Sequence, residues 1–288
     1  MTFHNKSVLI TGAAKGIGKA TAIRFAGAGA RVALLDRDAE TLAETCKQLG
    51  IGERVLPVVA DVGCSDEVSR AVDAAIDGFG GLDVLVTNAG ISFARAIDEY
   101  QDAEWDHILR VNLDGAFYAI RAGVAALRKS RGAIVIVSSM TALVGQDRGA
   151  AYAASKGALV SMTKALALEL AGDGIRVNCV CPAGVDTPLM RSWAATLPNP
   201  EAVLQGQASM HLLKRMATPD EIASAIAFLA SPDASFITGA ILPVEGGATL
   251  GRDPGSPAAA EPQRQQRQLA VRDAAILPDD EDPDPAWT

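Results

Sequence analysis

The chain has 288 residues, of which 49% are hydrophobic and 21% are charged, a length and balance that suit one large α/β domain. Its formal net charge is −8, and no apolar run approaches the roughly 20 residues that span a bilayer. Because nucleic acids and anionic membranes attract basic surfaces, we expect neither of them as a partner.

A glycine-rich turn follows the first predicted strand, residues 7–11. The segment reads TGAAKGIG from Thr11 to Gly18 and leads directly into a helical pattern. Glycine lets the backbone approach a ligand closely, and the free amide groups at a helix start attract phosphate. This strand–turn–helix context predicts the pyrophosphate site of a dinucleotide rather than a merely tight turn, with the residues Gly12, Lys15, Gly16, Ile17 and Gly18 around it.

Asp36 follows the second predicted strand, residues 31–35. A carboxylate roughly 20 residues beyond the turn accepts hydrogen bonds from the ribose of a bound dinucleotide. It also repels a 2′-phosphate, so NAD is expected rather than NADP, although Lys15 and Arg37 could each reach a phosphate.

The third and fourth predicted strands, residues 55–60 and 82–87, also end in candidate cofactor segments. Asp61-Val62 follows the third strand and is placed to meet the adenine edge. Asn88-Ala89-Gly90 follows the fourth and brings a further stretch of backbone close to the cofactor. Each segment would be an ordinary turn if it stood alone.

Asn112 lies in an otherwise apolar helical stretch after the fourth strand. A buried amide needs a hydrogen-bond partner. One candidate is a water molecule leading to Lys156, and the other is a polar group of the protein core.

Ser138-Ser139 end the fifth predicted strand, residues 133–138. A hydroxyl at the carboxyl end of a parallel strand points into the crevice where open α/β sheets bind ligands. Ser139 could therefore hold a substrate oxygen and stabilise the charge that develops on it.

Tyr152 and Lys156 stand four residues apart in the helical segment YAASK. At 3.6 residues per turn the two side chains share one face of the helix. A free phenol, with a pKa near 10, is a poor base at neutral pH, and a neighbouring ammonium favours the phenolate. The pair therefore predicts an acid/base group, with Tyr152 as the proton carrier.

The sixth predicted strand, residues 175–181, carries Cys179 and Cys181, while Cys46 and Cys64 stand alone. The spacing is not that of a zinc site, and the chain has only three histidines to add. We expect no metal site and free thiols, which suits a cytoplasmic protein.

Residues 186–212 are expected to form a lid over the substrate. This segment precedes the last predicted strand, residues 240–244, and holds one arginine, Arg191, and a neutral His211. Its apolar residues are Leu189, Met190, Trp193, Leu197, Val203 and Leu204. A charged substrate usually requires a cationic clamp, so a neutral and partly apolar alcohol or ketone is favoured.

The tail, residues 251–288, has a different composition. It is rich in proline and contains the segment QRQQRQ and the acidic run DDEDPD. Such a segment cannot bury enough apolar surface to order itself, so we expect it to be disordered.

Short apolar strands that alternate with helical patterns predict an α/β fold. Strands this uniformly apolar are covered on both faces. We therefore expect residues 1–250 to form a single Rossmann-type domain, a doubly wound, seven-stranded parallel sheet with helices on both faces.

In their order along the chain, these motifs resemble those of the short-chain dehydrogenase/reductase family, in the branch whose chains are about as long as residues 1–250. The resemblance rests on the turn at 11–18, Asp36, Asp61-Val62, Asn88-Ala89-Gly90, Asn112, Ser139 and the YAASK segment, with further matches at 178–182 and 213–247. It covers residues 1–250 and excludes the tail.

The resemblance implies hydride transfer between a nicotinamide and a carbonyl or alcohol carbon. Tyr152 would exchange the hydroxyl proton and Ser139 would hold the oxygen. Lys156 would lower the tyrosine pKa and bind the nicotinamide ribose, so Tyr152 and Lys156 also count as cofactor-binding, and Asn112 would support a proton-relay water. The segment after the sixth strand would line the nicotinamide through Pro182, Gly184, Val185 and Thr187.

The family is commonly tetrameric, so a homotetramer or a dimer is expected. The stripe Leu159, Met162, Ala165, Leu166 and Leu170 fits a shared interface, and the protein's own core explains much of it equally well.

Two positions depart from the family pattern. Ala183 precedes Gly184 where glycine usually follows the proline directly, and Glu245 replaces the aspartate of a later triplet.

Three functions remain open. The first is NAD-linked oxidation of a secondary alcohol. The second is reduction of a 3-oxoacyl thioester with NADPH, for which Arg128, Lys129 and Arg131 could dock an acidic carrier protein. The third is a catalytically idle NAD-sensing protein, which would have no need of Ser139, Tyr152 and Lys156.

Overall fold

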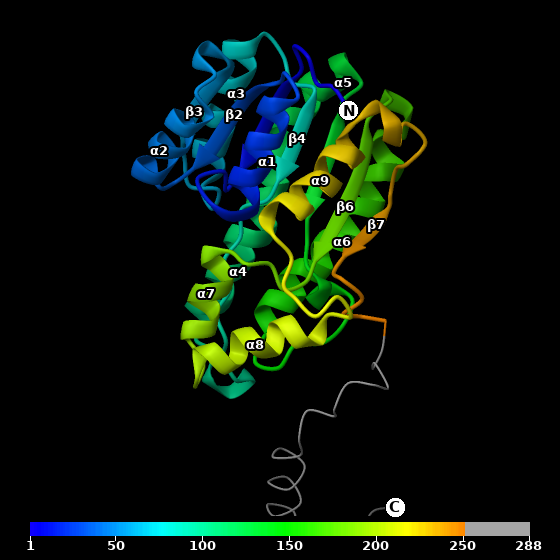
Figure 1. Ribbon diagram of the computed structural model, residues 1–288. Coiled ribbons are helices and arrows are strands. Elements are labelled where there is room, and N and C mark those ends of the chain that lie inside the picture. The colour runs from blue at the N-terminus through cyan, green and yellow to red at the C-terminus, as the bar shows by residue number, and fades with distance from the viewer. Residues whose placement is uncertain (251–288) are drawn as a thin grey trace, which may run out of the picture. The chain divides into compact units, whose positions relative to one another are not determined.

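Seven parallel strands form one sheet in the order β3-β2-β1-β4-β5-β6-β7 (Figure 1). A computed structural model describes residues 1–250, and the tail predicted to be disordered, residues 251–288, lies outside them. Each strand lies within two residues of its predicted range, and every pairing is parallel, which confirms the predicted sheet. The strands are β1 (Ser7–Thr11), β2 (Arg31–Asp36), β3 (Val55–Val59), β4 (Val84–Thr87), β5 (Ala133–Val137), β6 (Arg176–Pro182) and β7 (Ile241–Val244).

Helices connect the strands and cover both faces of the sheet. α1, α2 and α9 pack on one face, and α3, α5 and α6 pack on the other. The helices of the described chain are α1 (Gly16–Gly27), α2 (Ala39–Leu49), α3 (Ser65–Phe79), α4 (Asp102–Leu109), α5 (Gly115–Ser130), α6 (Ala150–Leu170), α7 (Pro188–Ala195), α8 (Pro200–Met210) and α9 (Pro219–Ala230). None of the helices within residues 1–250 combines the length and the apolar character that crossing a membrane requires.

The alternation of side chains along the strands explains why the core has two halves. In β1, Leu9 faces the α3, α5 and α6 side, whereas Val8 and Ile10 face the α1 and α9 side. Because successive strand residues point to opposite faces, a strand buried on both sides must be apolar throughout. All five side chains of β5 are accordingly buried.

The connections reverse direction between β1 and β4, which are neighbours in the sheet although β2 and β3 separate them in the sequence. In open α/β sheets a crevice forms at such a point, outside the carboxyl ends of the strands. Helices α7 and α8 lie beyond this edge (Figure 1). The fold therefore places the segments that follow β1, β4, β5 and β6 around one space.

Candidate active site

A cavity of about 670 Å³ lies at the carboxyl edge of the sheet. Its size falls within the range of small-molecule and cofactor sites. Most of the predicted site residues line it: Gly12, Lys15, Gly16, Ile17, Asp36, Arg37, Asp61, Val62, Asn88, Ala89, Gly90, Ser139, Tyr152, Lys156, Pro182, Val185 and Thr187. The predicted residues Gly18, Asn112 and Gly184 do not line the cavity, and each has a different position and contacts.

Asn88 ties the glycine-rich turn to the end of β4. Its Nδ2 donates to the carbonyl oxygens of Thr11 at 2.9 Å and Gly12 at 3.0 Å. The turn is packed so closely that a β-carbon on Gly12, where φ is +65°, would lie 2.8 Å from Ala89 Cα. A β-carbon on Gly18 would lie 2.1 Å from the Gly12 carbonyl oxygen. The absence of a side chain at Gly18 therefore allows α1 to pack against the turn, and Gly18 does not line the cavity.

Gly18→Ala is expected to weaken both folding and cofactor binding, because the new methyl group must displace backbone atoms of the turn. We expect a loss of about 1–3 kcal/mol in the free energy of unfolding, the usual cost of overpacking. Affinity for a dinucleotide should fall roughly tenfold, which is about 1.4 kcal/mol. Urea unfolding and NADH fluorescence titration measure the two effects.

Gly27→Ala is the matched control, since it changes the same helix at a position where a β-carbon meets nothing within 4 Å. It should leave NADH binding unchanged and should not lower stability, because alanine favours a helix over glycine by up to about 1 kcal/mol. Equal NADH affinity in the Gly18→Ala and Gly27→Ala proteins would contradict this account of the turn.

The start of α1 fits the pyrophosphate of a dinucleotide. Lys15 is its N-cap residue in extended conformation, and no acidic side chain occupies the first turn. Unpaired N–H groups and the helix dipole make such an end attractive to an anion. The glycines at 12 and 16 add no side chain to this part of the cavity, so the residues present fit the group.

The carboxylate of Asp36 lines the cavity at the end of β2. Its Oδ2 accepts from the Ala14 N–H at 3.0 Å and its Oδ1 from the Asp38 N–H at 3.1 Å. These two bonds hold the carboxylate in place at the cavity wall. Lys15 and Arg37, which are neighbours of Ala14 and Asp36 in the chain, also line the cavity, and both are exposed.

Ser139, Tyr152 and Lys156 come together across β5 and α6, as their spacing predicts. Ser138 fixes α6 in position, because its Oγ donates to the Lys156 carbonyl oxygen at 2.8 Å. Ser139 caps a short turn and its Oγ accepts from the Thr141 N–H at 3.2 Å, so its own proton stays available to another acceptor. Lys156 Nζ lies 5.7 Å from the centre of the Tyr152 ring.

Burial shifts the pKa values of both titratable groups in this cluster. Burial raises the pKa of Tyr152, and the nearby Ser139 hydroxyl partly offsets this effect. The Lys156 ammonium donates to the carbonyl oxygen of Val137 at 2.9 Å. Burial also lowers the pKa of Lys156 to about 8. The enclosed site disfavours the charged form of both groups.

Asn112 lies in a π-helical turn (Arg110–Asp114) between α4 and α5. Its Oδ1 accepts from the Ile91 N–H at 2.8 Å, and its Nδ2 donates to the Ile91 carbonyl oxygen at 3.0 Å and to Ser155 Oγ at 3.1 Å. These groups of the protein core are one of the two kinds of partner considered from the sequence. A β-carbon on Gly90 would lie 3.3 Å from Asn112 Oδ1 and 3.4 Å from Lys156 Nζ, so these two atoms flank the same point.

The segment after β6, residues 182–187, lies partly at the cavity and partly in the protein core. Pro182, Val185 and Thr187 line the cavity. Gly184 does not, because it faces His211, whose Cε1 would lie 2.8 Å from a β-carbon at this position. The buried His211 ring needs that space, which gives the shifted glycine a structural reason.

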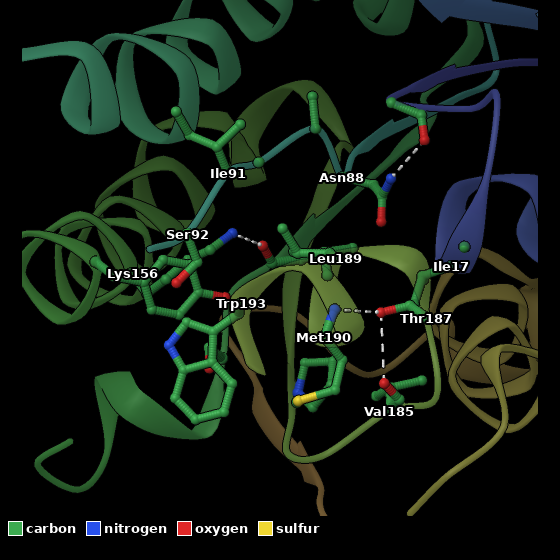
Figure 2. Close-up of a pocket in the computed structure, with 18 of the residues that line it drawn as sticks. Ile17, Asn88, Ile91, Ser92, Lys156, Val185, Thr187, Leu189, Met190 and Trp193 are labelled. Carbon is green, nitrogen blue, oxygen red and sulfur yellow. Dashed lines mark hydrogen bonds between the residues drawn. The ribbon is translucent and has the colours of Figure 1, made fainter. Parts of the chain in front are cut away.

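The predicted lid consists of α7 and α8. Thr187 caps α7 by accepting from the Met190 N–H at 3.2 Å, and Pro188 follows at the first helical position. Leu189, Met190 and Trp193 thereby line the cavity (Figure 2). The other apolar lid residues, Leu197, Val203 and Leu204, do not line it.

Sequence reasoning did not single out several cavity residues: Ile91, Ser92, Met140, Thr141, Gln146, Asp147, Gln207 and Met210. The position of residues 140–147 directly after Ser139 was a usable signal, since strand ends point into the crevice. Gln207 and Met210 lie within the predicted lid, but only the packing of α8 shows that these two of its residues line the cavity.

No group of histidine, cysteine, aspartate and glutamate side chains within residues 1–250 is arranged to hold a metal ion. All four cysteines are free thiols. Cys179 and Cys181 are buried on the same side of β6 with their sulfur atoms 4.0 Å apart.

A parallel sheet with a phosphate-binding turn at its switch point, and a Ser-Tyr-Lys cluster across the same cavity, is the arrangement of a nicotinamide-dependent oxidoreductase. Comparisons with known proteins specify it further. The family described as "Enoyl-(Acyl carrier protein) reductase" matches residues 12–249. The chain belongs to the short-chain dehydrogenase/reductase family, whose members use a nicotinamide cofactor to act on CH–OH or C=O groups.

Three relatives show the range of this similarity. Meso-2,3-butanediol dehydrogenase of Serratia marcescens is 39% identical, over 86% of this chain and 96% of that protein. The crystal structure of levodione reductase has a TM-score of 0.84 at 31% identity and covers 87% of this chain and 100% of that one. That of 3-ketoacyl-(acyl-carrier-protein) reductase from Brucella melitensis, complexed with NADH, has a TM-score of 0.80 at 36% identity and covers 86% and 99%.

Proposed function

We propose that this protein interconverts a neutral secondary alcohol and its ketone with NAD(H) as cofactor. The observation that carries the cofactor preference is the Asp36 carboxylate, held at the cavity wall by two backbone N–H groups. A fixed negative charge at this place favours ribose hydroxyls over a 2′-phosphate. The relative from Brucella melitensis, complexed with NADH, supports this preference.

The bound cofactor supplies a hydride acceptor in the oxidation and, in its reduced form, a hydride donor in the reduction. Tyr152 takes the proton from the alcohol, or gives one to the oxygen of the ketone. Ser139 donates its free proton to the same oxygen and holds it in place. Lys156 keeps its ammonium beside the site, while Asn112 acts as a positioning residue that fixes Ile91 and Ser155.

The cavity suits a neutral substrate. Its only lysine and arginine residues within the described chain are Lys15, Arg37 and Lys156, and the first two belong to the segments that hold Asp36. Arg191 of the lid pairs with Asp186 at 2.8 Å instead of pointing into the cavity. A carboxylate or phosphate substrate would lack the cationic clamp that such groups require. Two relatives, a butanediol dehydrogenase and levodione reductase, are named for neutral compounds, which agrees with a neutral substrate.

Reduction of a 3-oxoacyl thioester is the second candidate, and the Brucella relative is named for this activity. The basic residues suggested as its docking patch lie at the wrong edge of the sheet. Arg131 precedes β5, whereas Ser139 follows it, and Arg128 is already paired with Asp173 at 2.7 Å. This placement favours the alcohol dehydrogenase.

Asp36→Asn is expected to shift the ratio of NADH to NADPH affinity by roughly 10- to 100-fold toward NADPH, about 1.4–2.8 kcal/mol. Asparagine removes the charge and keeps an oxygen for only one of the two N–H groups, that of Ala14 or that of Asp38. Fluorescence titration with both coenzymes measures the ratio. The wild type should prefer NADH, and a preference for NADPH would contradict the proposed cofactor.

Asp38→Asn is the control, because it removes a nearby carboxylate that also lines the cavity, and asparagine caps a helix as well as aspartate does. It should change the coenzyme ratio less than threefold. Turnover of a panel of secondary alcohols with NAD then tests the reaction itself, and a protein that binds NADH but turns over none of them would be an idle binder.

We also propose that the protein is a homotetramer or a dimer and works in the cytoplasm, where its thiols stay reduced. The stripe predicted for the interface serves mainly the protein's own core, since Leu159 and Leu170 are buried. The support for an oligomer lies on the exposed side of α5 and α6, where Phe117 is 45% and Leu168 84% exposed. Covering such side chains favours association.

A further inference from the structure

The end of the predicted lid is anchored by the imidazole ring of His211, directly after α8. His211 is 2% exposed, and it is the only buried residue between Ala194 and Ile222, a stretch that the structure describes throughout. None of the residues of α8 itself is buried. Because a surface helix is held in place mainly by what it packs against, the position of α8 depends strongly on the residue that follows it.

The His211 ring lies between the ends of two neighbouring strands. A β-carbon on Gly184, after β6, would lie 2.8 Å from His211 Cε1, and one on Gly246, after β7, would lie 3.2 Å from its Cδ2. The two glycines therefore leave the space that the ring fills. The backbone after the ring bonds to the same two residues. The Leu213 N–H donates to the Gly246 carbonyl oxygen at 3.3 Å, and the Ala217 N–H donates to that of Gly184 at 2.9 Å.

The same ring is bonded to the part of α8 that lines the cavity. Its Nδ1–H donates to the carbonyl oxygen of Gln207, a group that can only accept, at 2.6 Å. The enclosed Nε2 has no hydrogen-bond partner among residues 1–250, so packing alone fixes the other edge of the ring. Gln207 and Met210 both line the cavity. A displacement of the ring would therefore move two side chains of the cavity wall.

Gly184 links this contact to the other lid helix. The chain continues from Gly184 through Val185 and Thr187, which line the cavity, to the start of α7. The ring thus packs against the segment from which α7 begins, and the two helices of the lid share one support.

We propose that His211 is the positioning residue that holds α8 over the substrate, by packing its ring between Gly184 and Gly246. The inference rests on the proposed function, in which α7 and α8 cover an alcohol or ketone. His211 does not line the cavity and takes no part in the proton transfer, so it acts through Gln207 and Met210. Its loss should weaken substrate binding and leave the rate of the bound complex largely unchanged.

His211→Ala removes the ring and should loosen α8. Amide hydrogen exchange of residues 200–210 should accelerate by roughly tenfold, while that of β5 stays unchanged. KM for cyclohexanol at saturating NAD should rise by roughly tenfold, with kcat and NADH affinity within about threefold of the wild type. His107→Ala, which removes an exposed histidine of α4 outside the cavity, is the matched control and should change none of these quantities.

A double-mutant cycle with Gly184→Ala separates positioning from a general loss of stability. Gly184 is not among the glycines with positive φ, so alanine is compatible with its backbone. With His211 present, the new methyl group collides with the ring and should raise KM by roughly fivefold. In the His211→Ala protein the same methyl group should leave KM unchanged or lower it. Gly206→Ala adds a methyl group to α8 where nothing lies within 4 Å, and it should not raise KM in either background.

Unchanged hydrogen exchange in α8, or an unchanged KM, in the His211→Ala protein would overturn the inference and leave the proposed function intact. Equal effects of Gly184→Ala with and without the ring would do the same. If His211→Ala does not fold, Gly184→Ala tests the same contact in a protein that keeps the ring. A wild type that oxidises neither cyclohexanol nor any other secondary alcohol of the panel would contradict the proposed function, and hydrogen exchange would still decide whether His211 holds α8.

Discussion

Tyr152→Phe is expected to lower kcat/KM for any alcohol or ketone substrate by about 10²- to 10⁴-fold, the usual contribution of a positioned acid/base group. Phenylalanine keeps the ring that lines the cavity but has no proton to exchange. NADH affinity should stay close to that of the wild type, and the free energy of unfolding should fall by no more than about 1 kcal/mol, the net contribution of the hydrogen bond between the phenol and Ser139. Steady-state kinetics, with NADH titration and urea unfolding on the same protein, separate these effects.

The pH profile of the wild type gives a second measurement of the same residue. Burial raises the pKa of Tyr152, so in the free enzyme the phenol keeps its proton at neutral pH. Oxidation of an alcohol needs the phenolate and should therefore accelerate as the pH rises, whereas ketone reduction needs the protonated phenol. Tyr118→Phe, on α5 and outside the cavity, is the control that should change neither rate nor profile. If kcat/KM of the Tyr152→Phe protein stayed within tenfold of the wild-type value, Tyr152 would not be the acid/base group.

Lys156→Met is expected to abolish most activity and yet to stabilise the fold at neutral pH. The residue is 3% exposed, and burial lowers its pKa from 10.5 to about 8. Each pKa unit corresponds to about 1.4 kcal/mol, so the buried charge costs the folded state about 3 kcal/mol below pH 8. Removing the charge recovers this free energy, but methionine loses the hydrogen bond to Val137. We therefore expect the free energy of unfolding to rise by about 1–2 kcal/mol.

The dependence on pH identifies the cause of this stabilisation. As the pH rises from 8 toward 10.5, the folded protein loses the Lys156 proton before the unfolded chain does, so the cost in the wild type diminishes. The difference in the free energy of unfolding between Lys156→Met and the wild type should therefore be largest near pH 7 and should shrink toward pH 10. Urea unfolding at several pH values measures it.

Lys164→Met supplies the comparison, because this lysine lies on the same helix but is exposed. It should change neither activity nor stability by a measurable amount. If Lys156→Met were less stable than the wild type at pH 7, the buried ammonium would not carry the cost assigned to it. Activity of Lys156→Met should fall on the order of 10²-fold or more, since the charge beside Tyr152 is lost.

The fold could be predicted because its determinants are local. Uniformly apolar segments such as β5, Ala133 to Val137, indicate strands that are covered on both faces, and their alternation with helices requires parallel crossovers. The Gly12–Gly18 turn and the Tyr152–Lys156 spacing are likewise local, since a turn or a single helical repeat places their groups.

Features that depend on how distant segments pack could not be predicted. The direction of the Lys156 ammonium depends on the Val137 carbonyl, and the partner of Asn112 depends on where Ile91 lies. Gly184 matched a cofactor motif by position, but His211, at the end of α8, occupies the space beside it.

The sequence by itself determined the parallel sheet, through periodicity and strand ends, and the class of this protein, through motifs that resemble those of its family. It also singled out the residues proposed to carry the hydride-transfer chemistry. The tertiary structure alone decided the environment of those residues. Burial raises the pKa of Tyr152 and lowers that of Lys156, and the docking of α7 encloses an indole N–H of Trp193 without a partner among residues 1–250. Solvation and hydrogen-bond partners arise from segments far apart in the chain, so no local pattern records them.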